Sequence, residues 1–147
     1  MHFEQVFQGE LTKMKSIIRL KSKKMLLIIN IESAEKEALS EIMAAHSGEV
    51  KEALSDQGGE KLGYLLGFNG FEASGEKAEV TQRAAVFSGV DGKELNEILA
   101  AMRERGIKIP LKAVCTAHNQ SWTLKALCEE LEQEHRYMNG GRQGEQA

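Results

Sequence analysis

The stretch that decides the fold is residues 83–138, which read RAAVFSGVDGKELNEILAAMRERGIKIPLKAVCTAHNQSWTLKALCEELEQEHRYM. Mostly apolar residues at Arg83–Val90 predict a buried strand. Asp91 then caps a helix whose apolar residues recur at three- and four-residue spacing, and Gly106 provides the left-handed residue that ends it. The stretch therefore begins as a strand followed by a helix.

A second strand and helix complete this stretch. Apolar residues alternate from Ile107 to Cys115, which predicts a strand with one core face. Pro110 has no N–H to give to a ladder, so this strand is expected at an edge of the sheet. The last helix is expected to start after Thr123, and the Trp122 indole just before it is expected to pack onto Leu127 at the helix entry. Its predicted end is Asn139-Gly140-Gly141.

A weaker strand–helix–strand pattern precedes these elements. Met25–Ile31 is a mostly apolar run that predicts a strand buried on both faces. Ser33 is expected to cap a helix whose apolar spacing continues to Leu54, with a break or kink at Ser47-Gly48. Leu62–Phe68 is expected to form the second strand.

Together these elements predict an α+β fold. Their order is β-α-β-β-α-β-α, and the simplest arrangement is a ferredoxin-like βαββαβ sandwich with an extra C-terminal helix. In that arrangement the first and third strands are central and the second and fourth are edges. The alternative is a small three-layer α/β fold with a parallel sheet. We interpret residues 25–138 as a single domain, residues 1–24 as a basic N-terminal appendage and residues 139–147 as a disordered tail.

Composition narrows the classes of function. The chain has 147 residues, of which 41% are apolar and 28% charged, as in an ordinary globular domain. Its net charge of −3 argues against a nucleic-acid-binding protein, and no apolar run is long enough to predict a membrane span. Both cysteines lie on predicted apolar faces, which suits reduced thiols in a cytoplasmic protein.

Residues 83–138 also resemble a family of small bacterial proteins known only as a domain of unknown function. Lys112 and Thr116 belong to the apolar strand of that pattern, and Asn119 and Trp122 complete a Thr-x-x-Asn-x-x-Trp spacing. The acidic helix Glu129–His135 follows. The resemblance supports the domain, and it implies no activity, cofactor or catalytic residue.

The best candidate site is the polar turn before the last helix. The candidate ligand-binding residues are Thr116, His118, Asn119, Ser121 and Trp122. Free N–H groups at a helix N-terminus favour an anion, so if the turn is a site, a small anionic ligand should bind at the amides of residues 119–124. The sequence favours the other interpretation, in which the same polar side chains only cap the helix and the turn.

Other chemistry has less support in the sequence. Cys115, His118, Cys128 and His135 lack the paired spacing of a zinc site, so no metal ion is expected. A nucleophile and base made of Cys115 and His118 is disfavoured because alternation turns the thiol toward the core. The chain has no phosphate-binding glycine motif and no nucleophile elbow, and no cofactor or catalytic residue is expected.

The sequence therefore favours a small cytoplasmic protein that acts as a non-enzymatic ligand-binding or regulatory module. Sheets of this kind often pair into homo-oligomers, so self-association is a further expectation. One alternative is an enzyme or anion-binding protein that uses the Thr116–Trp122 turn. Another is a protein-interaction adaptor that uses the polar loop Asn69–Thr81, because loops of this length within compact domains are often functional.

Overall fold

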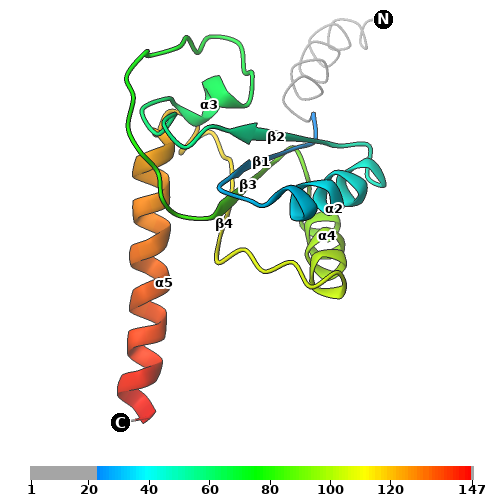
Figure 1. Ribbon diagram of the computed structural model, residues 1–147, viewed down its shortest axis with the longest axis vertical. Helices are drawn as coiled ribbons and strands as arrows, with labels where there is room; N and C mark the ends of the chain where they lie inside the picture. The colour runs from blue at the N-terminus through cyan, green and yellow to red at the C-terminus, as the bar shows by residue number, and fades with distance from the viewer. Residues whose placement is uncertain (1–22, 147) are drawn as a thin grey trace, which may run out of the picture.

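A computed structural model describes residues 23–146, with side chains described as far as Met138. Except for its last two residues, the predicted N-terminal appendage lies outside the described residues. Within them, one sheet contains β1 (Met25–Ile29), β2 (Glu49–Ala53), β3 (Ala84–Ser88) and β4 (Leu111–Val114). The helices are α2 (Ser33–Ala44), α3 (Leu62–Leu65), α4 (Gly92–Glu104) and α5 (Leu124–Gln146) (Figure 1).

The strands lie in the order β2-β1-β3-β4. β1 pairs in parallel with β2 and antiparallel with β3, and β3 pairs in parallel with β4. Each parallel pair is one strand–helix–strand unit, and the two units meet where β1 lies against β3. The predicted central places of β1 and β3, and the edge position of β4, are confirmed. Every side chain of the two central strands is buried.

Helices cover both faces of the sheet, with α2 and α4 on one side and α3 and α5 on the other (Figure 1). Side chains alternate along β1, so one strand supplies both cores. Leu26 and Ile28 pack with α2 and α4, whereas Met25, Leu27 and Ile29 pack with α3 and α5. The fold therefore has three layers.

The predicted α+β class is confirmed, but the ferredoxin-like strand order needs correction. A ferredoxin-like sheet is built from split strand–helix–strand units, each with a strand of the other unit between its own two. Here each unit closes on the adjacent strand, so both edge strands run parallel to their neighbours. The helices cover two faces, as in the three-layer alternative, but the sheet is mixed rather than parallel.

The second strand differs from the prediction in position. α2 ends at Ala44, the chain reverses through Ser47 with a φ of 63°, and β2 follows at Glu49–Ala53. Val50 satisfies both patterns, because it continues the apolar spacing of α2 and also pairs with Leu26 of β1. Pairing with a buried neighbouring strand decides the outcome, since strand formation depends more on context than on local propensity.

The predicted strand at Leu62–Phe68 is wrong, because Leu62–Leu65 form the short helix α3. Its two leucines and the following Leu66 are buried together, which helical spacing allows and strand alternation would not. α5 continues to Gln146, past the end predicted at Asn139-Gly140-Gly141. Although α5 is long, no described helix is apolar enough over a sufficient length to cross a membrane.

Pro110 marks a change of face that alternation did not predict. Ile107 and Ile109 are buried with α2 and α4, whereas Leu111 is buried on the side of α5. The sequence predicted one core face for all three residues. β4 begins only at Leu111, so the residues before it do not follow the alternation of the strand.

An ion pair links α2 to the start of β3. The Arg83 guanidinium donates hydrogen bonds to both carboxylate oxygens of Glu35, at 3.0 and 3.1 Å, and a third to the Lys108 carbonyl at 2.8 Å. The hydrogen bonds from Arg83 lower the pKa of Glu35, and the same bonds raise the pKa of Arg83. This contact connects the two strand–helix–strand units.

The Glu35–Arg83 pair predicts a defined response to acid. Because the folded-state pKa of Glu35 is depressed, its stabilising contribution is fully present above the ordinary value of 4.5 and is lost as pH falls through the lower folded-state pKa. Arg83→Met should therefore cost about 1–2 kcal/mol of unfolding free energy at pH 7 and less in acid. Thermal unfolding between pH 7 and pH 3 measures this, with the exposed Arg103→Met as control. If the loss of unfolding free energy in Arg83→Met were the same at pH 7 and pH 3, it would contradict the stabilising role of the Glu35–Arg83 ion pair.

Candidate functional site

The predicted polar turn lies between β4 and α5 and is held by its own side chains. Asn119 Oδ1 accepts the Thr116 N–H at 2.8 Å, and Asn119 Nδ2 donates to the Val114 carbonyl at 3.1 Å. Thr116 Oγ1 accepts the N–H groups of His118 and Asn119, each at 3.2 Å. These contacts correspond to the capping interpretation of the turn.

A short antiparallel contact joins the turn to residues Gly58–Gly63, which we call the bridging segment. The Leu62 N–H donates to the Trp122 carbonyl at 2.9 Å. The Gly63 N–H donates to the Gln120 carbonyl at 2.8 Å. The turn is therefore fixed from outside as well as from within.

The bridging segment also caps the N-terminus of α5. The Leu124 N–H donates to the Glu60 carbonyl at 2.9 Å, and the Lys125 N–H donates to the Gly58 carbonyl at 3.0 Å. Among the amides of residues 119–124, those of 119, 120, 122 and 124 already donate to protein atoms. Most of the donors expected to bind an anion are thus engaged, and binding at this turn stays a prediction.

The two rings of the turn lie against each other. The centroids of His118 and Trp122 are 5.8 Å apart, with an interplanar angle of 63° that is typical of an edge-to-face pair. Trp122 is half-buried against the core beneath α5, whereas His118 and Ser121 are exposed. The structure therefore brings the five predicted residues into one turn, with Trp122 partly structural.

The cysteines differ from reactive thiols. Cys128 is buried and Cys115 is half-buried, and burial raises the pKa of each thiol to about 11. Because the thiolate is the nucleophile, such groups are poorly prepared for attack at neutral pH. Within the described part of the chain, no three His, Cys, Asp or Glu side chains are placed to hold a metal ion.

The polar loop after α3 is anchored to the bridging segment by Glu60. Glu60 is only 7% exposed, and its carboxylate accepts the N–H groups of Ser74 and Gly75 at 2.7 and 3.2 Å. Further along the loop, Val80 is buried and its N–H donates to the Ser55 carbonyl at 2.8 Å. Residues 69–81 therefore form an irregular loop, as predicted, that is fixed at several points.

A cleft of about 690 Å³ opens between β2 and the chain that follows α3, and we call it the β2 cleft. Its apolar wall consists of Met25, Leu66, Phe68 and Phe71, and its polar lining of Lys23, Glu49, Lys51, Asn69 and Gln120, with Gly67. Sites for small molecules usually enclose roughly 300–1,000 Å³ and combine apolar walls with a few polar groups. The β2 cleft has both properties.

Strand alternation explains the charged rim of this cleft. Glu49, Lys51 and Ala53 pair with the β1 residues that belong to the α3 and α5 core, so they face the same side of the sheet. Ala53 is buried, while Glu49 and Lys51 are exposed at the cleft. Lys23 Nζ lies 3.8 Å from a Glu49 oxygen, and no carboxylate in the described range forms an ion pair with Lys51.

Gly63 leaves the space in which the Phe71 ring of the apolar wall packs. A Cβ on Gly63 would lie 2.5 Å from Phe71 Cε2, so only the missing side chain allows the ring to pack against α3. Gly63 is itself held by its hydrogen bond to the Gln120 carbonyl. The polar turn, α3 and the loop therefore meet at the β2 cleft, and Gln120 is the turn residue that lines it.

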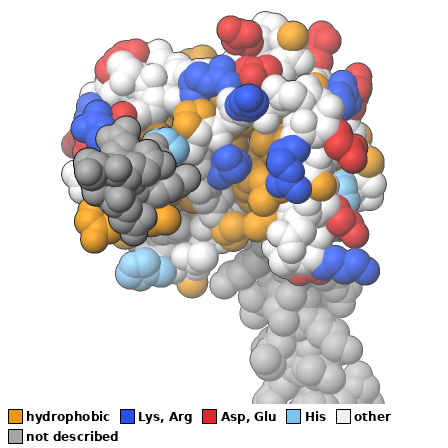
Figure 2. Space-filling model, turned by 90° about the horizontal axis from the view of Figure 1, so that it is seen from below, with side chains coloured by type: hydrophobic (Ala, Val, Ile, Leu, Met, Phe, Trp, Pro, Cys, Tyr) orange, Lys and Arg blue, Asp and Glu red, His pale blue; other side chains and the backbone are white. Residues whose placement is uncertain are grey.

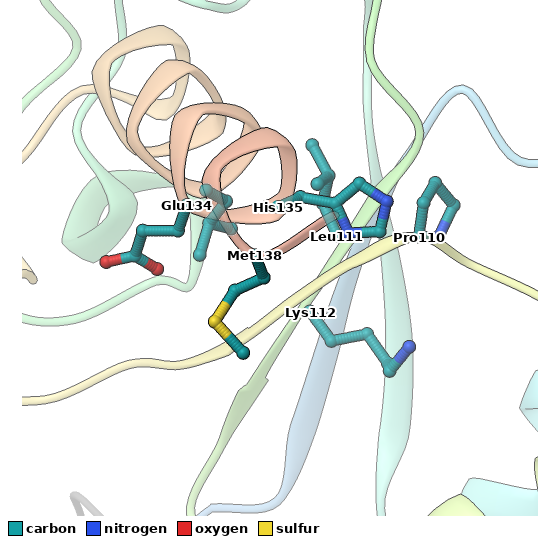
Figure 3. Close-up of a pocket in the computed structure, with 7 residues that line it drawn as sticks. Pro110, Leu111, Lys112, Glu134, His135 and Met138 are labelled. Atoms are coloured by element: carbon teal, nitrogen blue, oxygen red, sulfur yellow. The ribbon is translucent and has the colours of Figure 1, made fainter. Parts of the chain in front are cut away.

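A second hollow, of about 310 Å³, lies between β4 and α5, and we call it the β4–α5 groove (Figure 3). It is lined by Pro110, Leu111, Lys112, Leu131, Glu134, His135 and Met138. Figure 3 shows His135 pointing toward Pro110, while Glu134 projects from another side of the helix. Seen from below, the molecule exposes hydrophobic side chains among lysines and arginines (Figure 2).

A charged cluster outside both hollows joins the residue before β1 and the turn after α2 to α4. Lys24 Nζ donates to Glu94 Oε2 at 2.9 Å, and His46 Nδ1 lies 3.1 Å from the same oxygen. The hydrogen bond from Lys24 is the main cause that lowers the pKa of Glu94. These three residues line neither the β2 cleft nor the β4–α5 groove, and their contacts connect the elements on either side of them. No local pattern could have predicted the cluster, because its members are distant in the chain.

Residues 83–138 match the model of a family described as a domain of unknown function, DUF3783. The match covers β3, α4, β4 and the first part of α5, and it confirms the resemblance to a family of unknown function over these residues. No curated protein and no solved structure matches the chain. Within the β2 cleft, only Gln120 belongs to the matched residues.

Sequence reasoning missed the β2 cleft because its wall depends on two wrongly predicted elements. The sequence pattern predicts Lys51 in a helix and Phe68 at the end of a strand, whereas Lys51 lies in β2 and Phe68 follows α3. One signal could have found the site. Phe68 and Phe71 flank Asn69-Gly70 in a segment that is otherwise polar, and aromatic side chains are rarely left in such a loop without a surface to contact.

Gly58→Ala tests how much the packing of the bridging segment contributes to the stability of the fold. A Cβ at Gly58 would lie 2.5 Å from the Ala78 carbonyl oxygen, and the backbone is held there by its bond to the Lys125 N–H. We expect a loss of about 1–3 kcal/mol of unfolding free energy in a urea titration. Gly92→Ala is the matched control, because a Cβ there meets nothing within 4 Å. Equal stabilities of the two variants would contradict the role of Gly58.

Alkylation tests the state of the thiols. With a pKa of about 11 for Cys115 and Cys128, roughly one thiol in a thousand is ionised at pH 8. Iodoacetamide should therefore modify the native protein slowly at both positions, and the urea-unfolded protein much faster. Intact-mass measurements over time follow both reactions. Rapid modification of either cysteine in the native protein would show that its thiol is activated.

Proposed function

We propose that this chain is a small-molecule-binding module that holds its ligand in the β2 cleft. The observation that carries the proposal is the cleft of about 690 Å³, with an aliphatic and aromatic wall and two lysines at its rim. This chemistry fits a small molecule with a flat apolar body and one anionic group. The proposal retains the non-enzymatic module that the sequence favours and the small anionic ligand that it leaves open, and it puts the ligand next to the polar turn.

The apolar wall supports the first half of this ligand description. Phe68 and Phe71 come from the chain after α3, and Met25 and Leu66 complete the surface. Aromatic rings provide a large contact area and stack favourably on flat ligands. Phe71 belongs to the Asn69–Thr81 loop. In this proposal the loop therefore serves as a wall of the cleft, and it does not need the separate role as a protein-interaction adaptor that the sequence also suggested.

The rim supports the anionic group. Glu49 lies near Lys23 and offsets part of its charge, so Lys51 is the cation best placed for a ligand carboxylate or phosphate. The amides of Asn69 and Gln120 supply both donors and acceptors. Among the described residues that line the cleft there is no serine, cysteine or histidine, so the chemistry that these residues offer is recognition rather than covalent catalysis.

A suitable probe is 8-anilinonaphthalene-1-sulfonate, which joins aromatic rings to one anionic group. Its fluorescence should rise on binding to the native protein, and amide NMR shifts should map to the β2 cleft. Lys51→Ala should weaken binding about fivefold, as expected for the loss of about 1 kcal/mol of charge-assisted hydrogen bonding.

The control is Lys93→Ala, which removes an exposed lysine from α4, on the other face of the sheet. It should bind the probe as wild type does. Gly63→Ala provides a second test, because it forces the Phe71 ring out of its position and should reduce binding even though the charges are unchanged. The proposal is wrong if the shifts map elsewhere, or if Lys51→Ala and Lys93→Ala bind equally.

A further inference from the structure

The apolar stripe of α5 continues past the sheet that it covers. Leu124, Leu127 and Cys128 are buried in the core, and Leu131 packs partly against it. Beyond that point the helix extends away from the sheet (Figure 1), and Met138 of the same stripe is 61% exposed. An exposed apolar position at the end of a buried stripe indicates a surface that packs on something else.

Four residues on this part of α5 form a self-complementary pattern. Leu131, Glu134, His135 and Met138 lie within about 100° of the helix circumference, and all four line the β4–α5 groove. Their order is apolar, acidic, basic, apolar. The spacing is symmetrical about the midpoint between Glu134 and His135, so the pattern is the same read in either direction.

We propose that this face of α5 binds the same face of a second copy of the chain, with the two helices antiparallel. A two-fold axis at the midpoint places Leu131 opposite Met138 of the second copy, and Glu134 opposite His135 of the second copy. Both relations are repeated by symmetry, as an isologous interface requires. The imidazole N–H donates to the carboxylate, and the apolar side chains are removed from water on either side.

The charge pattern favours a second copy over a different partner. A basic peptide would satisfy Glu134 and leave His135 without an acid, and an acidic peptide would do the reverse. Pairing along the β4 edge is also disfavoured, because Pro110 and the outward Lys112 are features that block strand addition. The contact is short and lies outside the monomer core, so we expect a weak, concentration-dependent dimer.

Sedimentation velocity of the full chain over a range of concentrations measures the dimerisation constant. Glu134→Lys places a lysine opposite His135 of the second copy, and His135→Glu places two acids opposite each other. Each single reversal should raise the dissociation constant about fivefold or more. The double variant Glu134→Lys/His135→Glu should return close to wild type, because the acid and the base still oppose each other after the exchange.

The matched control is Glu129→Lys, which makes the same change of charge on the opposite side of α5 and should leave the dimer intact. All of these positions are exposed, and circular dichroism verifies that each variant folds. A chain that stays monomeric at every concentration would overturn the proposal and leave the face to another partner. A dimer that the single reversals do not weaken, or that the double variant does not recover, would overturn it as well.

Discussion

Four backbone hydrogen bonds between the bridging segment Gly58–Gly63 and residues Gln120–Lys125 hold together the side of the molecule on which the β2 cleft lies. They cap the first turn of α5, fix α3 against the polar turn and set the wall to which Phe71 packs. Glu60 extends the same connection to the long loop through its buried carboxylate. The helix, the turn, the loop and the wall of the cleft therefore all contact the bridging segment.

These contacts cross the boundary of the family match. Residues 83–138 include the first part of α5 but not the carbonyl groups that cap it, and they include β3 but not the central strand β1 beside it. The β2 cleft is built almost entirely from the unmatched residues, whereas the symmetrical face of α5 lies wholly within the match. The two surfaces thus belong to different parts of the chain.

The sequence predicted those elements whose partners follow from local pattern. β1, β3 and α4 were predicted near their positions, because buried strands and a capped helix carry their own signals. Val50 could not be assigned locally, since it fits a helix and a strand equally, and only pairing with Leu26 decides between them. The turn was located correctly as a structural unit. The fate of the Leu124 and Lys125 amides at the start of α5 was not predictable, because the Glu60 and Gly58 carbonyls that accept them lie more than sixty residues away in the chain.

The distance along the chain between the bridging segment and α5 also orders events during synthesis. The ribosome makes the bridging segment early and α5 after every other described element. The carbonyls of Gly58 and Glu60 therefore have no hydrogen-bond donor from α5 until that helix has been synthesised. Until then β1 can pair with β2 and β3, but the face that α5 covers stays open to water. Completion of the fold is therefore a late step with long-range contacts, during which the nascent chain exposes one side of its sheet to chaperones and to other chains.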